Sequence, residues 1–381
     1  MEIEIGRGKK ARRAYGFDDI TIVPSRRTRN PDEVDVSWKL GPYRFALPLV
    51  ASPMDAAVSP ATAKTIGRLG GLAILDLEGV WTRHEDAETQ LAQLATLSGA
   101  EGLARLRELY AAPIRPELIA ERIREIKSEP GVVVAGAFTP QRVRKYYEHA
   151  LDAGLDVLAI HTTVVSAEHV TERPAPDDEH DVLNLKEFIA EVPIPVVVGG
   201  CSSYHTGLHL MRTGAAGVLV GVGAGRGSTV RNVLGVGLPQ ATAVADVAGA
   251  RSTHVLETGE YVQVIADGGM RTGGDLAKAI ACGADAVMLG APLSRAVDAP
   301  GGGWHWTPTA VHRDLPRGSR IEVGTVGALE QVLMGPALSG DGATNLIGAL
   351  RRSMATCGFL DLAEFNRAGI AIAPDVHDPT T

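Results

Sequence analysis

The residues best suited to chemistry are Asp267, Gly268 and Gly269, which directly follow a run of β-branched and apolar residues at 261–266. Such a run is typical of a strand buried on both faces. Glycines at its end allow backbone N–H groups to approach an anion closely. A carboxylate at the same place can accept hydrogen bonds from ribose hydroxyls, although Asp-Gly is also a common turn pair. The pattern indicates a site for a sugar and a phosphate.

The segment that follows completes this predicted unit. Residues 273–283 carry apolar side chains three and four residues apart, which predicts a helix, and residues 286–289 form a second apolar run that ends at Gly290. A strand, a helix and a strand with glycines at both carboxyl ends make up half of the phosphate site of a β/α barrel.

Eight short apolar runs, most of them followed by a helical pattern, extend this unit to the whole chain. The runs span residues 47–54, 71–76, 132–138, 157–162, 194–201, 217–223, 262–267 and 286–289. The helical patterns span residues 59–69, 139–153, 183–192, 203–212, 240–250 and 274–281. This alternation predicts an α/β protein, a (β/α)₈ TIM barrel that forms a single domain over residues 1–381.

Two regions depart from the alternation. Residues 84–130 are rich in Ala, Leu, Glu and Arg at helical spacing, which predicts an insertion of two or three amphipathic helices that cover the barrel. Residues 294–323 hold two tryptophans and follow the last predicted strand. They are expected to form a flap over the carboxyl face, where barrel active sites lie. The alternative is a disordered surface loop, but tryptophans favour burial.

Composition excludes several classes of protein. The formal net charge of −8 disfavours nucleic acid as a partner. Three dispersed cysteines, Cys201, Cys282 and Cys357, fit neither a disulfide framework nor a metal site, which favours a reducing compartment. No apolar stretch approaches the roughly 20 residues that span a bilayer. We therefore expect a cytoplasmic protein that does not bind membranes.

The chain also contains six longer motifs in a fixed order: YGFDDITIVPSR, LPLVASPMD, GLAIL, GVLVGVGAGRGSTVRNVLGVGLPQ, IADGGMRTGGDLAKAIACGADAVMLG and NLIGALRRSMATCGF. Together they resemble the IMP dehydrogenase and GMP reductase family from about residue 15 to about residue 373. Flavin-dependent barrel oxidases, a weaker alternative, share only the phosphate segment. The resemblance implies a barrel enzyme of purine nucleotide metabolism and GMP biosynthesis, usually a homotetramer, which moves a hydride between C2 of a purine 5′-monophosphate (GMP, IMP or XMP) and NAD or NADP.

The resemblance also implies roles for individual residues. On the nucleotide side it places Ser52 and Met54 by the base, Asp267 by the ribose, and Gly225, Arg226, Gly268, Gly269, Gly290 and Ala291 by the phosphate. On the cofactor side it implies His161, Gly221 and Gly223. Arg226 and Ala291 stand where the family has small hydroxyl residues, His161 where it has an aspartate, and Gly200 where it has an asparagine.

The motif that carries the thiol nucleophile in the family is altered in this chain. Ser228, followed by Thr229, occupies the place of the thiol nucleophile, and a serine needs a base that the sequence does not nominate. Cys201, at the end of the fifth predicted strand, is a conceivable displaced nucleophile. The Arg-Tyr pair of the dehydrogenase flap is missing, and residues 84–130 are too short for the paired CBS regulatory modules. Two hypotheses follow: an NAD(P)-linked oxidoreductase, or a protein that binds purine nucleotides as a sensor or as a partner of an active enzyme.

Overall fold

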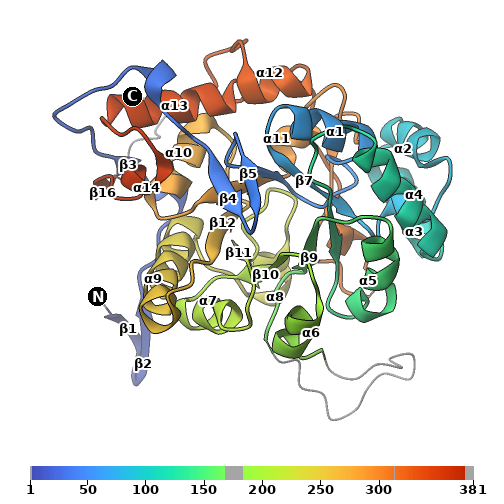
Figure 1. The fold of residues 1–381 in the computed structure, drawn as a ribbon, viewed down its shortest axis with the longest axis horizontal. Helices are drawn as coiled ribbons and strands as arrows, with labels where there is room; N and C mark the ends of the chain where they lie inside the picture. Colours follow the sequence, from blue (N-terminus) through green and yellow to red (C-terminus); the bar gives the residue numbers. More distant parts are fainter. Residues whose placement is uncertain (1, 168–182, 313, 374–381) are drawn as a thin grey trace.

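The computed structural model describes residues 2–167, 183–312 and 314–373. Its central element is a closed barrel of parallel strands, in which each strand pairs with the next one along the chain (Figure 1). The barrel strands are β6 (Leu49–Ala51), β7 (Leu72–Asp76), β8 (Ala135–Phe138), β9 (Val157–His161), β10 (Val196–Cys201), β11 (Gly217–Val220), β12 (Gln263–Asp267) and β13 (Ala286–Leu289). The predicted (β/α)₈ barrel is confirmed.

Each of the eight predicted runs contains one barrel strand, but the strands are shorter than the runs. β6 covers only Leu49–Ala51 because Pro48 and Pro53 flank it, and proline has no N–H for the ladder. β11 ends at Val220 because the chain turns at Gly223, whose φ is +68°. The apolar runs therefore locate the strands, while their ends are set by residues that leave the ladder.

The outer layer consists of helices that follow the strands (Figure 1). It comprises α1 (Pro60–Arg68), α4 (Pro116–Lys127), α5 (Val143–Asp152), α6 (Leu185–Glu191), α7 (Tyr204–Met211), α9 (Gln240–Thr258), α10 (Gly273–Ala281) and α13 (Leu346–Thr356). Helix α10 begins after Thr272, whose hydroxyl accepts a hydrogen bond from the backbone N–H of Asp275 while the Asp275 carboxylate accepts one from the N–H of Thr272. This cap fixes the helix that follows the Asp-Gly-Gly segment.

The region of residues 84–130 forms three helices, α2 (Ala87–Ala95), α3 (Gly99–Ala111) and α4. Helix α4 contacts α1 and α5, so it is the barrel's own helix between β7 and β8. The extra structure is therefore the α2–α3 pair, which lies beside α4 on the flank of the barrel (Figure 1). Its buried side carries Leu91, Leu94, Leu106 and Leu109.

Shorter elements surround the barrel. A hairpin of β4 (Trp38–Leu40) and β5 (Tyr43–Phe45) packs at its amino-terminal end, where Leu40 contacts the start of β11. The other strand pairs are β1 (Glu2–Gly6) with β2 (Lys9–Arg12), β3 (Ile20–Ile22) with β16 (Ile370–Ile372), and β14 (Trp304–His305) with β15 (Ile321–Glu322). The remaining helices are α8 (Val230–Leu234), α11 (Ala291–Ser294), α12 (Leu329–Met334), α14 (Leu362–Phe365), and the 3₁₀ turns η1 (Phe17–Asp19), η2 (Pro31–Glu33), η3 (Val80–Thr82) and η4 (Pro308–Val311).

The flap region, residues 294–323, is folded against the α2–α3 pair over the part that is described, which leaves out residue 313. Trp304 donates a hydrogen bond from Nε1 to the carbonyl of Ala95 (3.1 Å), at the end of α2. The guanidinium of Arg320 stacks 3.8 Å from the Trp304 ring and donates to two carbonyls near the end of the same helix. Trp306 is fully buried. The tryptophans thus secure the flap region to the helical insertion.

A buried chain of hydrogen bonds continues from the flap region to the barrel. The indole N–H of Trp306 donates to the hydroxyl of Tyr110 on α3 (3.3 Å), and that hydroxyl donates to the carboxylate of Asp55. Asp55 also accepts the backbone N–H of Val80 (2.8 Å), and its burial raises the pKa of its carboxyl to about 6. The three regions therefore share one buried polar network.

None of the helices in the described ranges is long and apolar enough to cross a membrane. Among the same residues, no group of three or more His, Cys, Asp or Glu side chains is arranged to hold a metal ion.

Candidate functional site

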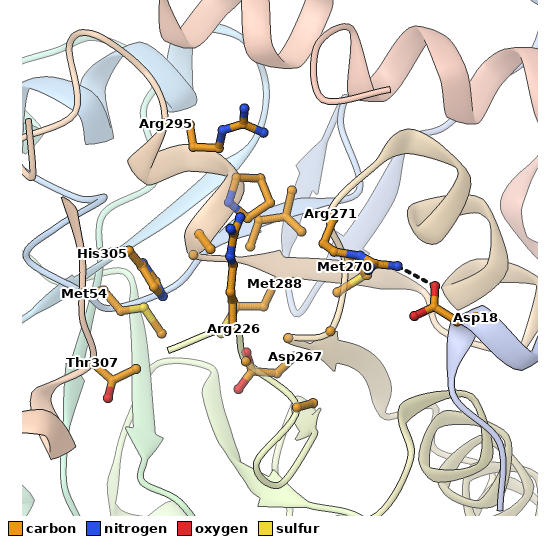
Figure 2. Close-up of a pocket in the computed structure, with 18 residues that line it drawn as sticks. Asp18, Met54, Arg226, Asp267, Met270, Arg271, Met288, Arg295, His305 and Thr307 are labelled. Atoms are coloured by element: carbon orange, nitrogen blue, oxygen red, sulfur yellow. Dashed lines mark hydrogen bonds and ion pairs between the residues drawn. The ribbon is translucent and has the colours of Figure 1, made fainter. Parts of the chain in front are cut away.

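A cavity of about 290 Å³ lies at the carboxyl ends of β11, β12 and β13, below the flap region (Figure 2). Except for Ser52, the residues that the sequence assigns to a nucleotide all line it: Met54, Gly225, Arg226, Asp267, Gly268, Gly269, Gly290 and Ala291. Ser52 is buried below the cavity, and its backbone N–H donates to the carbonyl of Leu289 (2.9 Å). Residues from separate loops are thus brought into one wall.

Two glycine loops meet in this wall. Gly268 and Gly269 both have φ of +80°, the left-handed region that favours glycine. A Cβ at Gly268 would lie 3.0 Å from the backbone nitrogen of Gly225, so the loops after β11 and β12 touch through their backbones. A wall of bare backbone gives an anion direct access to N–H groups. The contact requires glycine at position 268.

Asp267 is held from across the barrel mouth. Its Oδ2 lies 3.3 Å from Nε2 of His161, at the end of β9, and the two side chains reach over the ends of β10 and β11. That space is free because Gly200 and Gly221 carry no side chain. A Cβ at Gly200 would lie 2.4 Å from the backbone carbonyl oxygen of Gly221, and a Cβ at Gly221 would lie 2.0 Å from the backbone carbonyl oxygen of Asp267.

Gln240, the last residue of the GVGLPQ segment, fixes the backbone next to Gly221. It is buried, and its Nε2 donates to the carbonyls of Val220 and Asp267 (3.0 Å). The ends of β11 and β12 are thereby tied together. Gly223, which the sequence assigns to the cofactor side, does not line the cavity, and a Cβ there would lie 3.2 Å from Cγ of Arg231.

Sequence reasoning missed several cavity residues, some from distant segments and two, Arg271 and Arg295, from the neighbourhood of assigned residues. These are Asp18, Arg271, Arg295, His305 and Thr307. Arg271 is paired with Asp18, and its Nε lies 3.5 Å from the carboxylate of Asp275. Within the described ranges, the side chains of Arg226 and Arg295 take part in no hydrogen bond or ion pair. The cavity therefore presents two uncompensated cations from different loops.

His305 is the buried polar side chain of this wall. Its Nδ1 lies 3.0 Å from the hydroxyl of Ser294, and a Cβ at Gly290 would lie 3.2 Å from the ring and 2.8 Å from the sulfur of Met54. Figure 2 shows His305 and Met54 on one side of Arg226, and Arg271 with Asp18 on the other. Burial and the nearby Arg226 charge lower the pKa of His305 to about 4. The imidazole is therefore neutral at neutral pH.

This neutral histidine predicts a pH dependence of stability. The pKa of His305 in the folded protein is about 4, below its ordinary value of 6.5. Its contribution to the free energy of unfolding is therefore fully present above pH 6.5 and is lost as the pH falls from 6.5 through 4. We expect roughly 3 kcal/mol of the free energy of unfolding to disappear over that window. Urea denaturation at a series of pH values measures it, and His305→Gln should flatten the curve.

The exposed His209 on α7 provides the control, because His209→Gln changes the same side-chain type outside the cavity. Its curve should follow that of the wild type. An unchanged pH dependence in His305→Gln would show that the cavity does not hold this ring neutral.

Ser228 and Thr229, which the sequence nominates as catalytic, do not line the cavity. The Ser228 backbone bridges Gly318 of the flap region, and its hydroxyl accepts the N–H of Val230 (3.3 Å). The N–H of Thr229 donates to the carbonyl of Arg317 (3.1 Å). Among the described residues no basic side chain hydrogen-bonds to Ser228, so its hydroxyl lacks the partner that activates a serine.

The cysteines do not replace the missing thiolate. Cys201 lies at the end of β10 and is fully buried, which raises the pKa of its thiol to about 12. Burial likewise raises the pKa of Cys282 to about 12. Both thiols are protonated at neutral pH, and the thiol is a far weaker nucleophile than the thiolate.

Comparisons with known proteins identify a family, two relatives and a solved structure that this chain resembles. Residues 14–313 fit the family model of the IMP dehydrogenase / GMP reductase domain. The chain is 48% identical over 379 residues to an "uncharacterized oxidoreductase" of Mycobacterium tuberculosis, covering 97% of this chain and 99% of that protein. It is 28% identical to inosine-5′-monophosphate dehydrogenase of Methanocaldococcus jannaschii, covering 77% and 74%. The crystal structure of an IMP dehydrogenase/GMP reductase-like protein from Corynebacterium glutamicum has a TM-score of 0.91 and 43% identity over 98% of each chain.

Proposed function

Because the chain belongs to the IMP dehydrogenase / GMP reductase family, we propose that it is an NAD(P)-linked oxidoreductase that binds a purine 5′-monophosphate (GMP, IMP or XMP) at the barrel mouth. The observation that carries this proposal is the convergence of Asp267 with the glycine loops after β11, β12 and β13 on one cavity. A carboxylate beside bare backbone N–H groups matches a ribose next to a phosphate. The family resemblance also implies a cytoplasmic homotetramer.

The ligand would lie along the cavity wall. Asp267 accepts hydrogen bonds from the ribose hydroxyls, and its contact with His161 holds the carboxylate in place. The phosphate lies against the backbones of Gly225, Gly269 and Gly290. The purine lies toward Met54, which lines the same cavity and which the family resemblance places by the base. These assignments give each end of the nucleotide a chemically suitable partner.

A nicotinamide group would be held over the floor made by Gly200 and Gly221, beside His161. Side chains at either glycine would collide with neighbouring carbonyl oxygens, so the floor is flat backbone that suits a planar ring. Bound there, the cofactor supplies a hydride acceptor or donor. The imidazole of His161 presents a nitrogen toward Asp267, at the boundary between this floor and the nucleotide cavity.

The geometry of Ser228 favours a second candidate, a purine nucleotide-binding protein without redox chemistry. Its hydroxyl accepts the N–H of Val230 and has no base as a partner among the described residues, while eight of the nine residues assigned to the nucleotide line one cavity. Losing an activated nucleophile costs several powers of ten in rate. Such a protein would act as a sensor or as a partner of an active enzyme.

Calorimetry and absorbance spectroscopy distinguish the candidates. We expect GMP, IMP or XMP to bind with micromolar affinity, and nicotinamide absorbance to change when the bound nucleotide is mixed with NAD(P)H or NAD(P)⁺. Binding without turnover in the wild type, together with turnover in Ser228→Cys, would support the second candidate. If none of the three nucleotides bound, the proposed cavity assignment would be wrong.

A further inference from the structure

We propose that Arg226 and Arg295 form a subsite for a second phosphate group, so that the cavity binds purine nucleoside 5′-diphosphates more tightly than monophosphates. The inference rests on the proposed function, which places the first phosphate on the glycine loops. It goes further by assigning a second phosphate to Arg226, which the resemblance places only by the first, and to Arg295, to which the sequence assigns no ligand.

The charge balance around the cavity singles out these two side chains. Arg271 is compensated by Asp18 and Asp275, and Asp267 is engaged by His161. Arg226 and Arg295 have no hydrogen bond or ion pair within the described residues. The uncompensated positive charge therefore belongs to one pair that lines one cavity.

The carboxylate of Asp341 interacts electrostatically with Arg295, but it does not neutralise the pair of arginines. Hydrogen bonds from Ser339 and Ala343 lower the pKa of Asp341, with a smaller contribution from the charge of Arg295, and Asp341 and Arg295 form no ion pair. The Asp341 carboxylate accepts instead the hydroxyl of Ser339 (2.6 Å) and the N–H of Ala343 (3.1 Å). It is exposed, so solvent screens its effect on the cavity.

Arg295 carries a direct indication of a missing partner. Its Nε is buried and has no hydrogen-bond acceptor. Buried donors are mostly paired in folded proteins, and this one belongs to a guanidinium whose other nitrogens also have no partner within the described residues. The side chain lines the cavity from the end of α11, one turn beyond Ala291. An anion in the cavity would lie beside this unpaired guanidinium.

The order of groups along the cavity places the second phosphate. Figure 2 shows Asp267 at one end, with the Arg226 side chain extending away from it toward the end where Arg295 lies. A ribose on Asp267 and a first phosphate on the glycine loops leave the guanidinium groups farther along the same line. A guanidinium offers paired N–H donors that match phosphate oxygens. A diphosphate continues in that direction, whereas a monophosphate stops short.

Calorimetry of matched ligand pairs tests the subsite. GDP and GMP, then IDP and IMP, are titrated at low salt without divalent cations, since these would chelate the diphosphate. We expect the diphosphate to bind about tenfold more tightly, with an advantage that shrinks as salt is raised. Arg226→Gln and Arg295→Gln should each bring the ratio close to one. Arg7→Gln, at an exposed arginine in the turn between β1 and β2, removes the same charge elsewhere and should keep the ratio.

Inorganic pyrophosphate and phosphate repeat the comparison without a purine, and thus without relying on the proposed function. If pyrophosphate binds more tightly than phosphate and loses this advantage in Arg226→Gln, the subsite is supported even where no nucleotide binds. Equal affinities for GDP and GMP in a protein that binds both would overturn the subsite and leave the proposed function standing. Absence of binding by these six probes and by XMP would overturn both.

Discussion

Replacing Asp267 with alanine is expected to weaken the binding of GMP or IMP by about a hundredfold. The carboxylate is the group at the cavity that can accept hydrogen bonds from both ribose hydroxyls, and hydrogen bonds to a charged acceptor contribute roughly 1.5–3 kcal/mol each. Two such bonds, together with the His161 contact at 3.3 Å that orients the carboxylate, account for about 3 kcal/mol, which is about a hundredfold in affinity. Isothermal titration calorimetry measures the loss.

A ligand cycle shows whether this loss comes from the ribose. Wild-type protein should bind 2′,3′-dideoxy-GMP about as weakly as Asp267→Ala binds GMP, and the variant should no longer distinguish the two ligands. Asp267→Asn keeps the shape of the side chain and should show a similar loss if the charge matters. A variant that kept its preference for the ribose form would remove Asp267 from the proposed role.

The barrel could be predicted from the sequence because its strands are buried on both faces. Such strands are continuous apolar runs, as in Leu72–Asp76, where every residue is buried. The strand ends were harder to place, because a strand ends where its hydrogen bonds to the adjacent strand end, and an apolar run can continue beyond that point. β6, enclosed between two prolines, shows how far a run of apolar residues can exceed its strand.

The cavity was predictable where its residues are local in sequence and unpredictable where they are not. Asp267, Gly268 and Gly269 follow one strand, so their shared role is visible in a few letters. Asp18 and Thr307 reach the same cavity from distant segments, which only the closed barrel brings together. His305 had a usable signal: Trp304 and Trp306 alternate with it in sequence, and a half-buried and a buried tryptophan on one face direct the residue between them to the other.

The helical insertion shows a similar limit. Its helical spacing was evident, but spacing does not tell which helix belongs to the barrel. Contacts of α4 with α1 and α5 settle that α2 and α3 are the added pair. Their position also explains the flap tryptophans, because Trp304 and Trp306 bond to Ala95 and Tyr110 of that pair. An insertion and a flap that are far apart in sequence thus form one packing unit.

Gly221→Ala is expected to destabilise the fold by more than about 3 kcal/mol, because it overpacks a site with no room to relax. The new Cβ would lie 2.0 Å from the carbonyl oxygen of Asp267 and 3.2 Å from Nε2 of Gln240. These two atoms are hydrogen-bonded to each other (3.0 Å) at the end of β12, and the N–H of Gly221 itself donates to the carbonyl of Cys201 (2.8 Å). Thermal and urea denaturation should show the loss, and nucleotide binding should disappear with it.

Gly225→Ala is the matched control, since it adds the same methyl group to the neighbouring part of the loop. No atom lies within 4 Å of that Cβ, so the variant should be as stable as the wild type. The methyl would nevertheless stand in the cavity wall and hold a phosphate away from the backbone N–H groups, which should lower nucleotide affinity about tenfold. If Gly225→Ala bound nucleotide normally, the phosphate would have to lie elsewhere, and if Gly221→Ala were stable, the floor between His161 and Asp267 would be more adaptable than its contacts indicate.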